Sequence, residues 1–417
     1  MPVPLAVKIF PNPANAIYNP ETQIDDWTAS VQNLTFSSNA FGGFQNCTFT
    51  LRRGFDALYR ILEGRQGQPT YISNRLRIEG VPQVGQVIPW EGLIATMELV
   101  YGQQVKSRSY LNMFNAVRVQ HLNKKGKRKV FTIAGDGGQR GKFGTRVFVL
   151  DTDLRANANT TLPTAIANRF LQTHKRPNRS SGTEIGGVKR EIGLRVTCIG
   201  MADTLKWRYA FNSKNAAAQD TGEIIKDMLR ASPTNEWREP SITPYAQQFI
   251  TENFNTITST GMLVPPVEVQ GKTRLDIIAD LLRYGNNAGE RMLFQVFQGT
   301  GGKGQARFLR QTNAMPFTDS FRGYYFSGTK NQVFDQGQKR IMPWLVRAGN
   351  WLVDLDSQLS PPRGAADIFD DPRAMWMEEL SYNVDQDILR VMITDQAQTE
   401  YYLGRLIQGA ALVTETI

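Results

Sequence analysis

The first hundred residues alternate between apolar and polar side chains, and this period of two constrains the fold more than any other feature. In "ASVQNLTFSS" the buried face is marked by Val31, Leu34 and Phe36, and "QNCTFTLRR" repeats the pattern after the turn "NAFGGF". Such runs predict strands with one buried face that are joined by hairpins. A short helix over 55–64 and two more strand-like runs follow. Strands in this order, with glycines at the corners, predict a small barrel or sandwich.

The run "IPWEGLIATMELVYG" at 88–102 allows two interpretations. It could be the edge of a reaction site, or only the start of a barrel strand. We favour the second interpretation. Trp90 is expected to fill the end of a barrel, and Gly92 to let a neighbouring backbone approach closely. Ile94 then faces inward on the same side of the strand.

The rest of the chain is less regular. Between 103 and 189 we expect a hairpin turning at Gly126, a loop over "AGDGGQRGKFG", a short helix capped by Thr164 and a basic loop over "HKRPNRSSGTEIGG". An α/β unit follows, with helices that begin near Thr221 and after Thr273 and with a glycine-rich hairpin at "GTGGKG". Strand-like runs then return, and a last helix is predicted near "AQTEYYLGRLIQGAAL".

Composition indicates a globular protein. With 417 residues and 41% hydrophobic side chains, the chain is long enough for two or three domains with real cores. No apolar run approaches the ~18 residues of a membrane helix, and the start "MPVPLAVKIFPNP" lacks the order of a signal peptide. We therefore expect a soluble protein that is made in a cytoplasm and not exported by the usual signal.

Positive charge is concentrated in one central stretch. The net charge is +10, yet residues 101–210 hold 21 Lys and Arg against 6 Asp and Glu, while the remainder is net acidic. A run of this kind is either a solvated hairpin tip or a contact for a polyanion. Because few aromatic side chains lie near it, base stacking is not favoured. We predict that the cluster docks a partner; its members are Lys124, Lys125, Lys127, Arg128 and Lys129.

Residues suited to catalysis or metal binding are few. His121 and His174 are the only imidazoles, and no Gly-x-Ser-x-Gly run provides a nucleophile. Cys47 and Cys198 lie in strand-like runs, where buried thiols are expected. "GTGGKG" does not fit a phosphate loop, because Phe297 stands where the first glycine belongs. The sequence therefore predicts no enzymatic activity, no cofactor and no metal.

Several short motifs follow one another along most of the chain. The first is the strand of Trp90, Gly92 and Ile94. Later come "LRVTCIGMADTLKW", "DTGEIIKDML", "GKTRLDIIADLLRYG" and "PWLVRAGNWLVDLD". In this order they resemble the hub proteins of bacteriophage tail tips and baseplates. The matching positions after the first strand are Val196, Gly200, Leu205, Thr221, Ile224, Ile225, Gly349 and Trp351.

The resemblance implies an α+β fold that is mainly β, with two small tail-tube-like barrels. The first barrel would be built from 1–102 plus 190–215, and the second from 313–417. An α/β inserted domain would occupy 216–312. Residues 103–189 form a basic insertion for which the resemblance gives no counterpart.

The resemblance further implies a structural hub that joins the tail tube to distal spike or fibre proteins. Three copies would form a ring around the channel for the tape-measure protein and DNA, and the chain would be part of the virion, assembled in the cytoplasm of a bacterial host. Three alternatives stay open: a six-fold distal tail ring protein, a tail-associated cell-wall hydrolase, or a nucleic-acid-binding protein that uses the basic insertion.

Overall fold

A computed structural model gives the fold. It describes residues 5–15, 18–64, 70–80, 88–123, 125–126, 128–134, 137–155, 161–183, 190–209, 218–230, 249–251, 253–264, 272–287, 291–310, 323–327, 332–334, 340–354 and 374–393. The predicted last helix lies outside these residues. Among them, no helix has the length and apolar character needed to cross a membrane.

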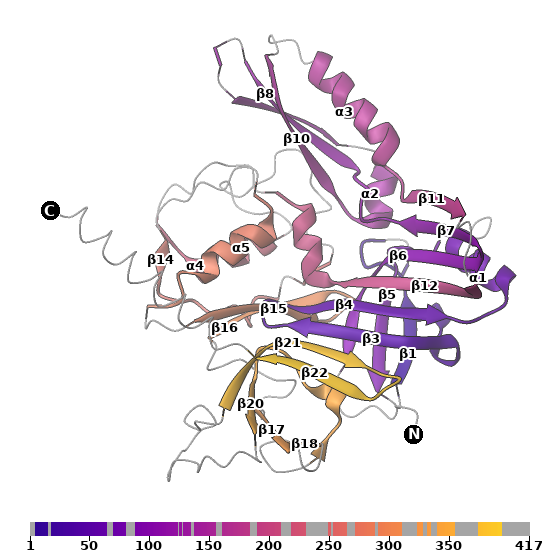
Figure 1. Ribbon diagram of the computed structural model, residues 1–417. Helices are drawn as coiled ribbons and strands as arrows, with labels where there is room; N and C mark the ends of the chain where they lie inside the picture. Colours follow the sequence, from indigo (N-terminus) through magenta and orange to yellow (C-terminus); the bar gives the residue numbers. More distant parts are fainter. Residues whose placement is uncertain are drawn as a thin grey trace.

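Most of the described strands hydrogen-bond into one curled, 17-stranded network (Figure 1). The alternation of the first hundred residues accounts for its early members, as predicted. The strands are β1 (Leu5–Phe10), β2 (Asp25–Asp26), β3 (Val31–Asn39), β4 (Gly42–Leu51), β5 (Arg75–Gly80), β6 (Trp90–Gly102), β7 (Gln104–Ser109), β11 (Asn178–Thr183), β12 (Arg190–Gly200), β15 (Met292–Gln298), β16 (Gly304–Arg310), β17 (Gly323–Ser327), β18 (Gln332–Phe334), β19 (Arg340–Ile341), β20 (Trp351–Asp354), β21 (Ala374–Asn383) and β22 (Ile388–Ile393).

The centre of the network is an antiparallel series in the order β5, β6, β12, β4, β3, β21 and β22. The long strand β6 pairs with β12 along one edge and with β5 and then β7 along the other. Strand β15 runs parallel to the start of β4 and continues the sheet into the hairpin β15–β16. The described chain is thus mainly β, as expected.

Two separate barrels are not confirmed. Strand β21 pairs with β3, and Figure 1 shows yellow β21 and β22 beside indigo β3. Strand β20 in turn pairs with β21, so Trp351 belongs to the same network as Trp90. The main hydrophobic cluster likewise includes side chains from β6, β15 and both helices of the predicted α/β unit. The domain boundaries stay a prediction.

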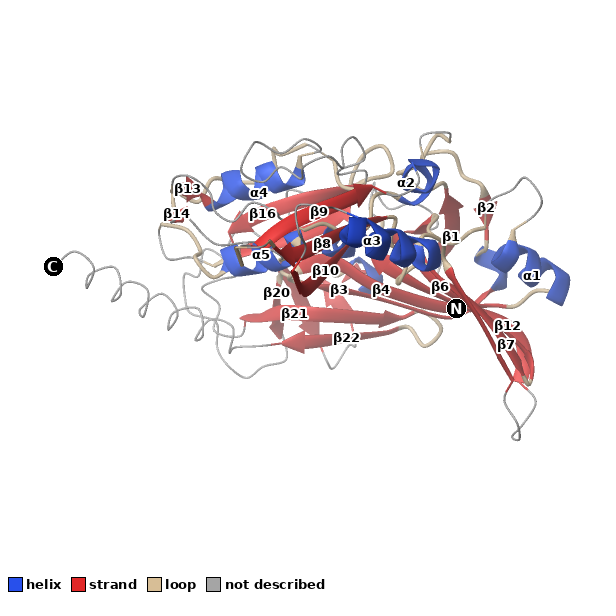
Figure 2. Cartoon of the chain, turned by 90° about the horizontal axis from the view of Figure 1, so that it is seen from above, coloured by secondary structure: helices blue, strands red, loops and turns tan. Residues whose placement is uncertain are grey.

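The basic insertion leaves the sheet through a two-stranded ribbon. Strand β7 turns back from β6 and pairs with β11, the described strand that precedes β12 in sequence. The residues between β7 and β11 in sequence form a second sheet, in the order β10-β8-β9, which α3 covers (Figures 1 and 2). Its elements are β8 (Ala116–Leu122), β9 (Arg128–Ala134), α2 (Gly137–Phe143), β10 (Val147–Arg155) and α3 (Thr161–His174). The predicted β8–β9 hairpin at Gly126 is confirmed.

Three expectations for the insertion are wrong. Residues 137–143 form α2 instead of a loop, because Phe143 packs on the main core and this contact outweighs the helix-breaking glycines. The predicted loop at 178–183 is strand β11, whose composition is overridden by pairing with β7. Thr164 lies inside α3, which begins at Thr161.

The remaining helices follow their sequence signals. Helix α1 (Phe55–Glu63) is followed by Gly64, at φ 78°. The side chain of Asp220 accepts from two backbone amides at the start of α4 (Thr221–Leu229). Thr273 and Asp276 form a capping box on α5 (Arg274–Leu282). Nearby lie the 3₁₀ turn η2 (Met201–Trp207) and a small sheet of β13 (Gln219–Asp220) and β14 (Leu263–Val264); the other 3₁₀ turns are η1 (Thr28–Ser30) and η4 (Pro343–Leu345).

Replacement of Gly200 by alanine tests how tightly the strands are packed. A Cβ at this position would come within 1.7 Å of the carbonyl oxygen of Phe44. We expect Gly200→Ala to lower the free energy of unfolding by about 1–3 kcal/mol, because the backbone must shift to accept the methyl group. Urea unfolding followed by tryptophan fluorescence measures the loss.

Gly182→Ala is the matched control, since a Cβ at Gly182 meets nothing within 4 Å. Its effect should stay within about 0.5 kcal/mol. Equal stability of the two variants would contradict the tight approach at Gly200.

Candidate functional site

The motif of Trp90, Gly92 and Ile94 lies at the start of β6, in the interior of the protein. Trp90 and Ile94 are both 0% exposed. A Cβ on Gly92 would lie 2.4 Å from the indole of Trp90 and 2.2 Å from the carbonyl oxygen of Ile199. The indole of Trp90 and the backbone of β12 therefore both lie so close to Gly92 that no larger residue fits there.

The motif at the end of β12 lies beside the motif at the start of β6. Gly200, at the end of β12, is the register partner of Gly92, and Cys198 is the partner of Ile94. Although more than a hundred residues separate these positions in sequence, they face each other across two strands. That these residues are architectural stays a prediction, and their placement is consistent with it.

Arg347 ties the C-terminal part of the chain to this strand. Its guanidinium donates hydrogen bonds to the carbonyl oxygens of Ile88 and Pro89, directly before Trp90. The same group lies 4.4 Å from the ring centroid of Phe44, and Phe44 packs on Trp90 at 6.2 Å. Burial lowers the pKa of the Arg347 guanidinium well below its usual range. Arg347 thus holds the start of β6 in two ways, through hydrogen bonds to the backbone directly before it and through Phe44, which packs on Trp90.

Gly349 and Trp351 lie in another part of the strand network, away from Trp90. Gly349 has a φ of 78°, and a Cβ on it would come within 2.2 Å of the side chain of Gln295. Trp351 contacts Trp376 edge-on, with ring centroids 5.5 Å apart. The two tryptophan motifs are therefore separate packing centres.

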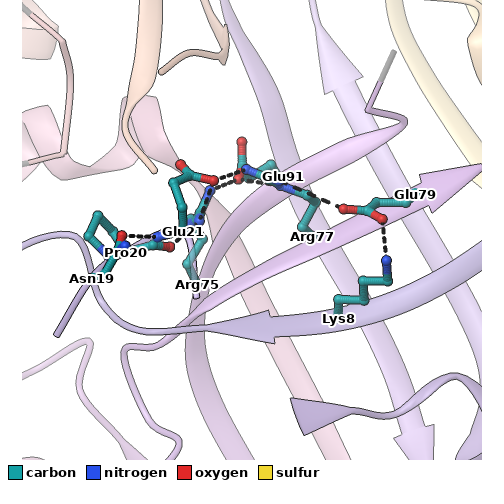
Figure 3. A network of polar contacts seen from close by, with 8 residues as sticks. All are labelled: Lys8, Asn19, Pro20, Glu21, Arg75, Arg77, Glu79 and Glu91. Atoms are coloured by element: carbon teal, nitrogen blue, oxygen red, sulfur yellow. Dashed lines mark hydrogen bonds and ion pairs between the residues drawn. The ribbon is translucent and has the colours of Figure 1, made fainter. Parts of the chain in front are cut away.

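A chain of buried charges runs beside the motif (Figure 3). Arg75 is 0% exposed and Glu91 is 1% exposed. One nitrogen of Arg75 donates to Glu91, and another donates to the carbonyl oxygen of Pro20. Arg77 donates to the same Glu91 oxygen over 3.0 Å. Glu91 therefore balances two guanidinium groups in the interior.

The chain continues to the surface at both ends. At one end the carboxylate of Glu21 lies 3.6 Å from Arg75 and 3.5 Å from Arg77. At the other end Glu79 joins Arg77, at 3.7 Å, to Lys8, at 2.6 Å. Burial lowers the pKa of Arg77, but the carboxylates, with Glu91 foremost, outweigh this effect and raise it. Each carboxylate of this charge network, Glu21, Glu79 and Glu91, is therefore paired with at least one cation.

The glycine-rich hairpin borders this charge chain. A Cβ on Gly302 would come within 2.9 Å of Pro20 and 3.1 Å of the Arg75 guanidinium. "GTGGKG" is thus the β15–β16 turn, as predicted, and its glycine allows the turn to approach a buried arginine.

Sequence reasoning missed the charge chain. Alternation in β6 predicts a solvent-facing Glu91, whereas residues 90–95 are buried on both faces. The available signal was the charged face of "RLRIEG", where Arg75, Arg77 and Glu79 alternate with Leu76 and Ile78. Pairing that face with Glu91 requires the β5–β6 register, which sequence alone does not provide.

The predicted docking cluster lies at the tip of the β8–β9 hairpin, far along the insertion. Lys125 is exposed, and its backbone amide donates to the side chain of Asn123. Arg128 and Lys129 start β9, but their side chains lie outside the described part of the chain, as do Lys124 and Lys127 entirely. The role of the cluster stays a prediction.

A buried arginine braces the base of the insertion and joins it to the 3₁₀ turn η2. Arg146 donates to the carbonyl oxygens of Tyr110 and, over 2.7 Å, Leu111. Its guanidinium carbon lies 4.0 Å from the ring centroid of Trp207. Burial lowers the pKa of Arg146 to about 10, and Tyr110 offsets part of this shift. The insertion is therefore fixed by more than its two connecting strands.

Candidate groups for catalysis or metal binding do not gather. Cys47 and Cys198 are register partners, both buried, and burial raises the pKa of the Cys198 thiol. His121 lies on β8, while His174 ends α3 and stacks on Phe170 at 4.1 Å. Within the described ranges, no three His, Cys, Asp or Glu side chains lie close enough to hold a metal ion.

Comparison with known proteins gives only weak similarity. The sequence matches no protein-family profile and no curated protein. Among solved structures, the chain is similar to an E. coli component of the type VI secretion system, described as resembling the T4 bacteriophage tail proteins gp27 and gp5. Identity is 8%, 88% of this chain and 71% of that chain are covered, and the TM-score is 0.37.

Two further similarities are of the same order. A 43 kDa tail protein of prophage MuSo2 from Shewanella oneidensis shares 8% identity, with 93% of this chain and 96% of that chain covered and a TM-score of 0.35. A Francisella PdpA-VgrG complex shares 7% identity over 86% of this chain and 38% of that chain, with a TM-score of 0.28. At such scores the similarities carry no argument about function.

Neutralising Glu91 tests the buried charge chain. We expect Glu91→Gln to lower the free energy of unfolding by about 3–5 kcal/mol, because Arg75 then keeps a buried charge with only the partly exposed carboxylate of Glu21 beside it. Chemical denaturation of the purified protein measures this. Glu21→Gln, at a side chain that is 43% exposed, should cost at most about 1 kcal/mol.

A double variant, Arg75→Met with Glu91→Met, removes both charges and should recover much of the loss. If Glu91→Gln is as stable as Glu21→Gln, the interior ion pair has no structural importance.

Proposed function

We propose that this protein is a structural, non-enzymatic hub of a bacteriophage-type tail tip or baseplate. The observation that carries the proposal is the convergence of the motifs. Gly92 and Gly200, from two motifs far apart in sequence, are register partners at a backbone crossing that no side chain could occupy. A third motif glycine, Gly349, also sits where a Cβ would clash. These three glycines of the resemblance thus share one physical property, which is that a Cβ at each position would clash with its neighbours.

The way in which the strands are connected also supports a structural role. The N-terminal strands, strands β7 and β11 of the insertion and the C-terminal strands are joined by backbone hydrogen bonds of one network. The main hydrophobic cluster runs through the same parts. A rigid body of this kind suits a piece that must hold its neighbours in fixed positions while other components pass.

In this proposal three copies form a ring between the tail tube and the spike or fibre proteins. The ring encloses the channel through which tape-measure protein and DNA pass. The four domains expected from sequence would then be parts of one body. Closed symmetry is the usual way in which identical chains build such a ring.

Symmetry of the assembled protein tests the proposal. Purified full-length chain, or tails that contain it, should give three-fold class averages by electron microscopy, and the isolated assembly should have a mass of three 46.9 kDa chains. A six-fold ring would assign the chain to the distal tail ring instead. A stable monomer absent from purified tails would refute a hub.

Partner docking by the basic cluster is tested by charge removal. Glutamine at Lys124, Lys125, Lys127, Arg128 and Lys129 should weaken incorporation into tails, because acidic surfaces of neighbouring tail proteins lose their ionic partners. Quantitative blotting of purified tails measures incorporation, and circular dichroism of the isolated chain checks folding.

The matched control removes the same charge elsewhere, with glutamine at Arg195, Lys206, Lys272, Arg283 and Arg390, all exposed. Normal incorporation is expected for this control. Normal incorporation of the cluster variant, combined with failed DNA delivery, would assign the cluster to the channel.

A further inference from the structure

A pocket of about 200 Å³ opens where the N-terminal loop, the turn before β5 and helix α2 of the insertion meet. Its wall includes Asn12 and Asn15 of the loop, Tyr71 of the turn and Lys142 of α2. Three segments distant in sequence thus build one cavity, beside the motif strand and outside the buried charge chain.

One polar group in this wall has an unused hydrogen-bond donor. Asn12 is only 2% exposed. Its Oδ1 accepts from the backbone amide of Ala14 over 2.8 Å, while its buried Nδ2 has no partner among the residues that the structure describes. A buried donor left unsatisfied costs about 1–3 kcal/mol. The side chain therefore favours a ligand that brings a hydrogen-bond acceptor into the pocket.

The opposite wall is held in a strained backbone conformation. Ser73 has a φ of 68°, a region that residues other than glycine rarely adopt, and it is 2% exposed. Its amide donates to the carbonyl oxygen of Ile94, and the amide of Ile94 donates to the carbonyl oxygen of Asn74. Strain of this kind concentrates at binding sites, where the surroundings enforce it. Here the motif strand β6 enforces it.

The aromatic side chains of the pocket are positioned in different ways. Tyr71 packs on Trp27 with ring centroids 5.4 Å apart. Burial, with a contribution from Asp25, raises the pKa of Tyr71 to about 12, so the phenol stays neutral. Tyr18 is 45% exposed at the rim. One ring packs within the wall, and the other lies exposed at the rim, where a bound molecule could stack on it.

The chemistry of the wall defines the ligand class. The wall combines amide and hydroxyl side chains with the apolar side chains of Ile24, Ile72 and Phe143. Among its described lining residues there is no carboxylate, and Lys142, their one cation, is exposed. We propose that this pocket binds one ring of a neutral sugar, a hexose or N-acetylhexosamine. Such a ring has hydroxyl acceptors and donors on its edge and an apolar face, and the volume is below the ~300 Å³ at which drug-sized sites begin.

Saturation-transfer NMR and a titration test the proposal with glucose, N-acetylglucosamine and the anionic analogue glucuronate. We expect saturable binding of the neutral sugars. Tyr18→Ala and Asn12→Asp should each weaken it by about tenfold, the loss expected for one contact or hydrogen bond. Asn12→Asp keeps the acceptor for Ala14 and removes the donors. Leu263→Ala, at a 63% exposed side chain outside the pocket, should bind like the parent protein.

Circular dichroism confirms that each variant is folded, and Tyr18→Ala provides the test if Asn12→Asp is not. Three results would overturn the proposal: no saturable binding of either neutral sugar, binding that Tyr18→Ala leaves unchanged, or a preference for glucuronate. None of these outcomes bears on the hub proposal, which is tested by symmetry.

Discussion

The structure depends on a backbone crossing that only glycine permits. Where β6, β12 and β4 meet, a Cβ on Gly92 would strike the carbonyl of Ile199, and a Cβ on Gly200 would strike that of Phe44. A few residues away, Gly43 approaches Val296 just as closely, with φ 76°. Because β12 ends there, β15 can take its place beside β4. The N-terminal strands and the β15–β16 hairpin are joined at this point, and the sheet can curl around the main hydrophobic cluster.

Buried arginines connect the other parts. Each donates to backbone carbonyl groups far away in sequence: Arg75 to Pro20, Arg108 to Leu62, Arg146 to Tyr110 and Leu111, Arg274 to Met228, and Arg347 to Ile88 and Pro89. All are at most 8% exposed. A guanidinium suits this task, since its five donors can satisfy several loop carbonyls that a sheet leaves unpaired. Part of the positive charge of the chain therefore lies inside, and the charge of the basic stretch overstates what its surface presents.

Local signals made part of the fold predictable. Period-two alternation located the early strands, and Asp220, Thr273 and Gly64 marked helix ends, because caps act within a few residues. Strand β11 was missed, since only its pairing with β7 makes "NRSSGT" extended. The single network and the charge on Glu91 depend on register between distant strands, which no local pattern encodes. The candidate pocket was unpredictable for the same reason, as its walls come from three separate segments.

The attachment of the insertion bears on how a hub could use it. Strands β7 and β11 continue the hydrogen bonding of β6. Arg146 adds a second attachment through Trp207, which itself contacts Phe249 at 5.5 Å. A force applied to the insertion would thus reach β6, which carries Gly92, through the hydrogen bonds between β7 and β6. In a hub, a partner docked on the insertion would therefore act on a strand of the glycine crossing, where a Cβ on Gly92 would clash with the backbone of β12.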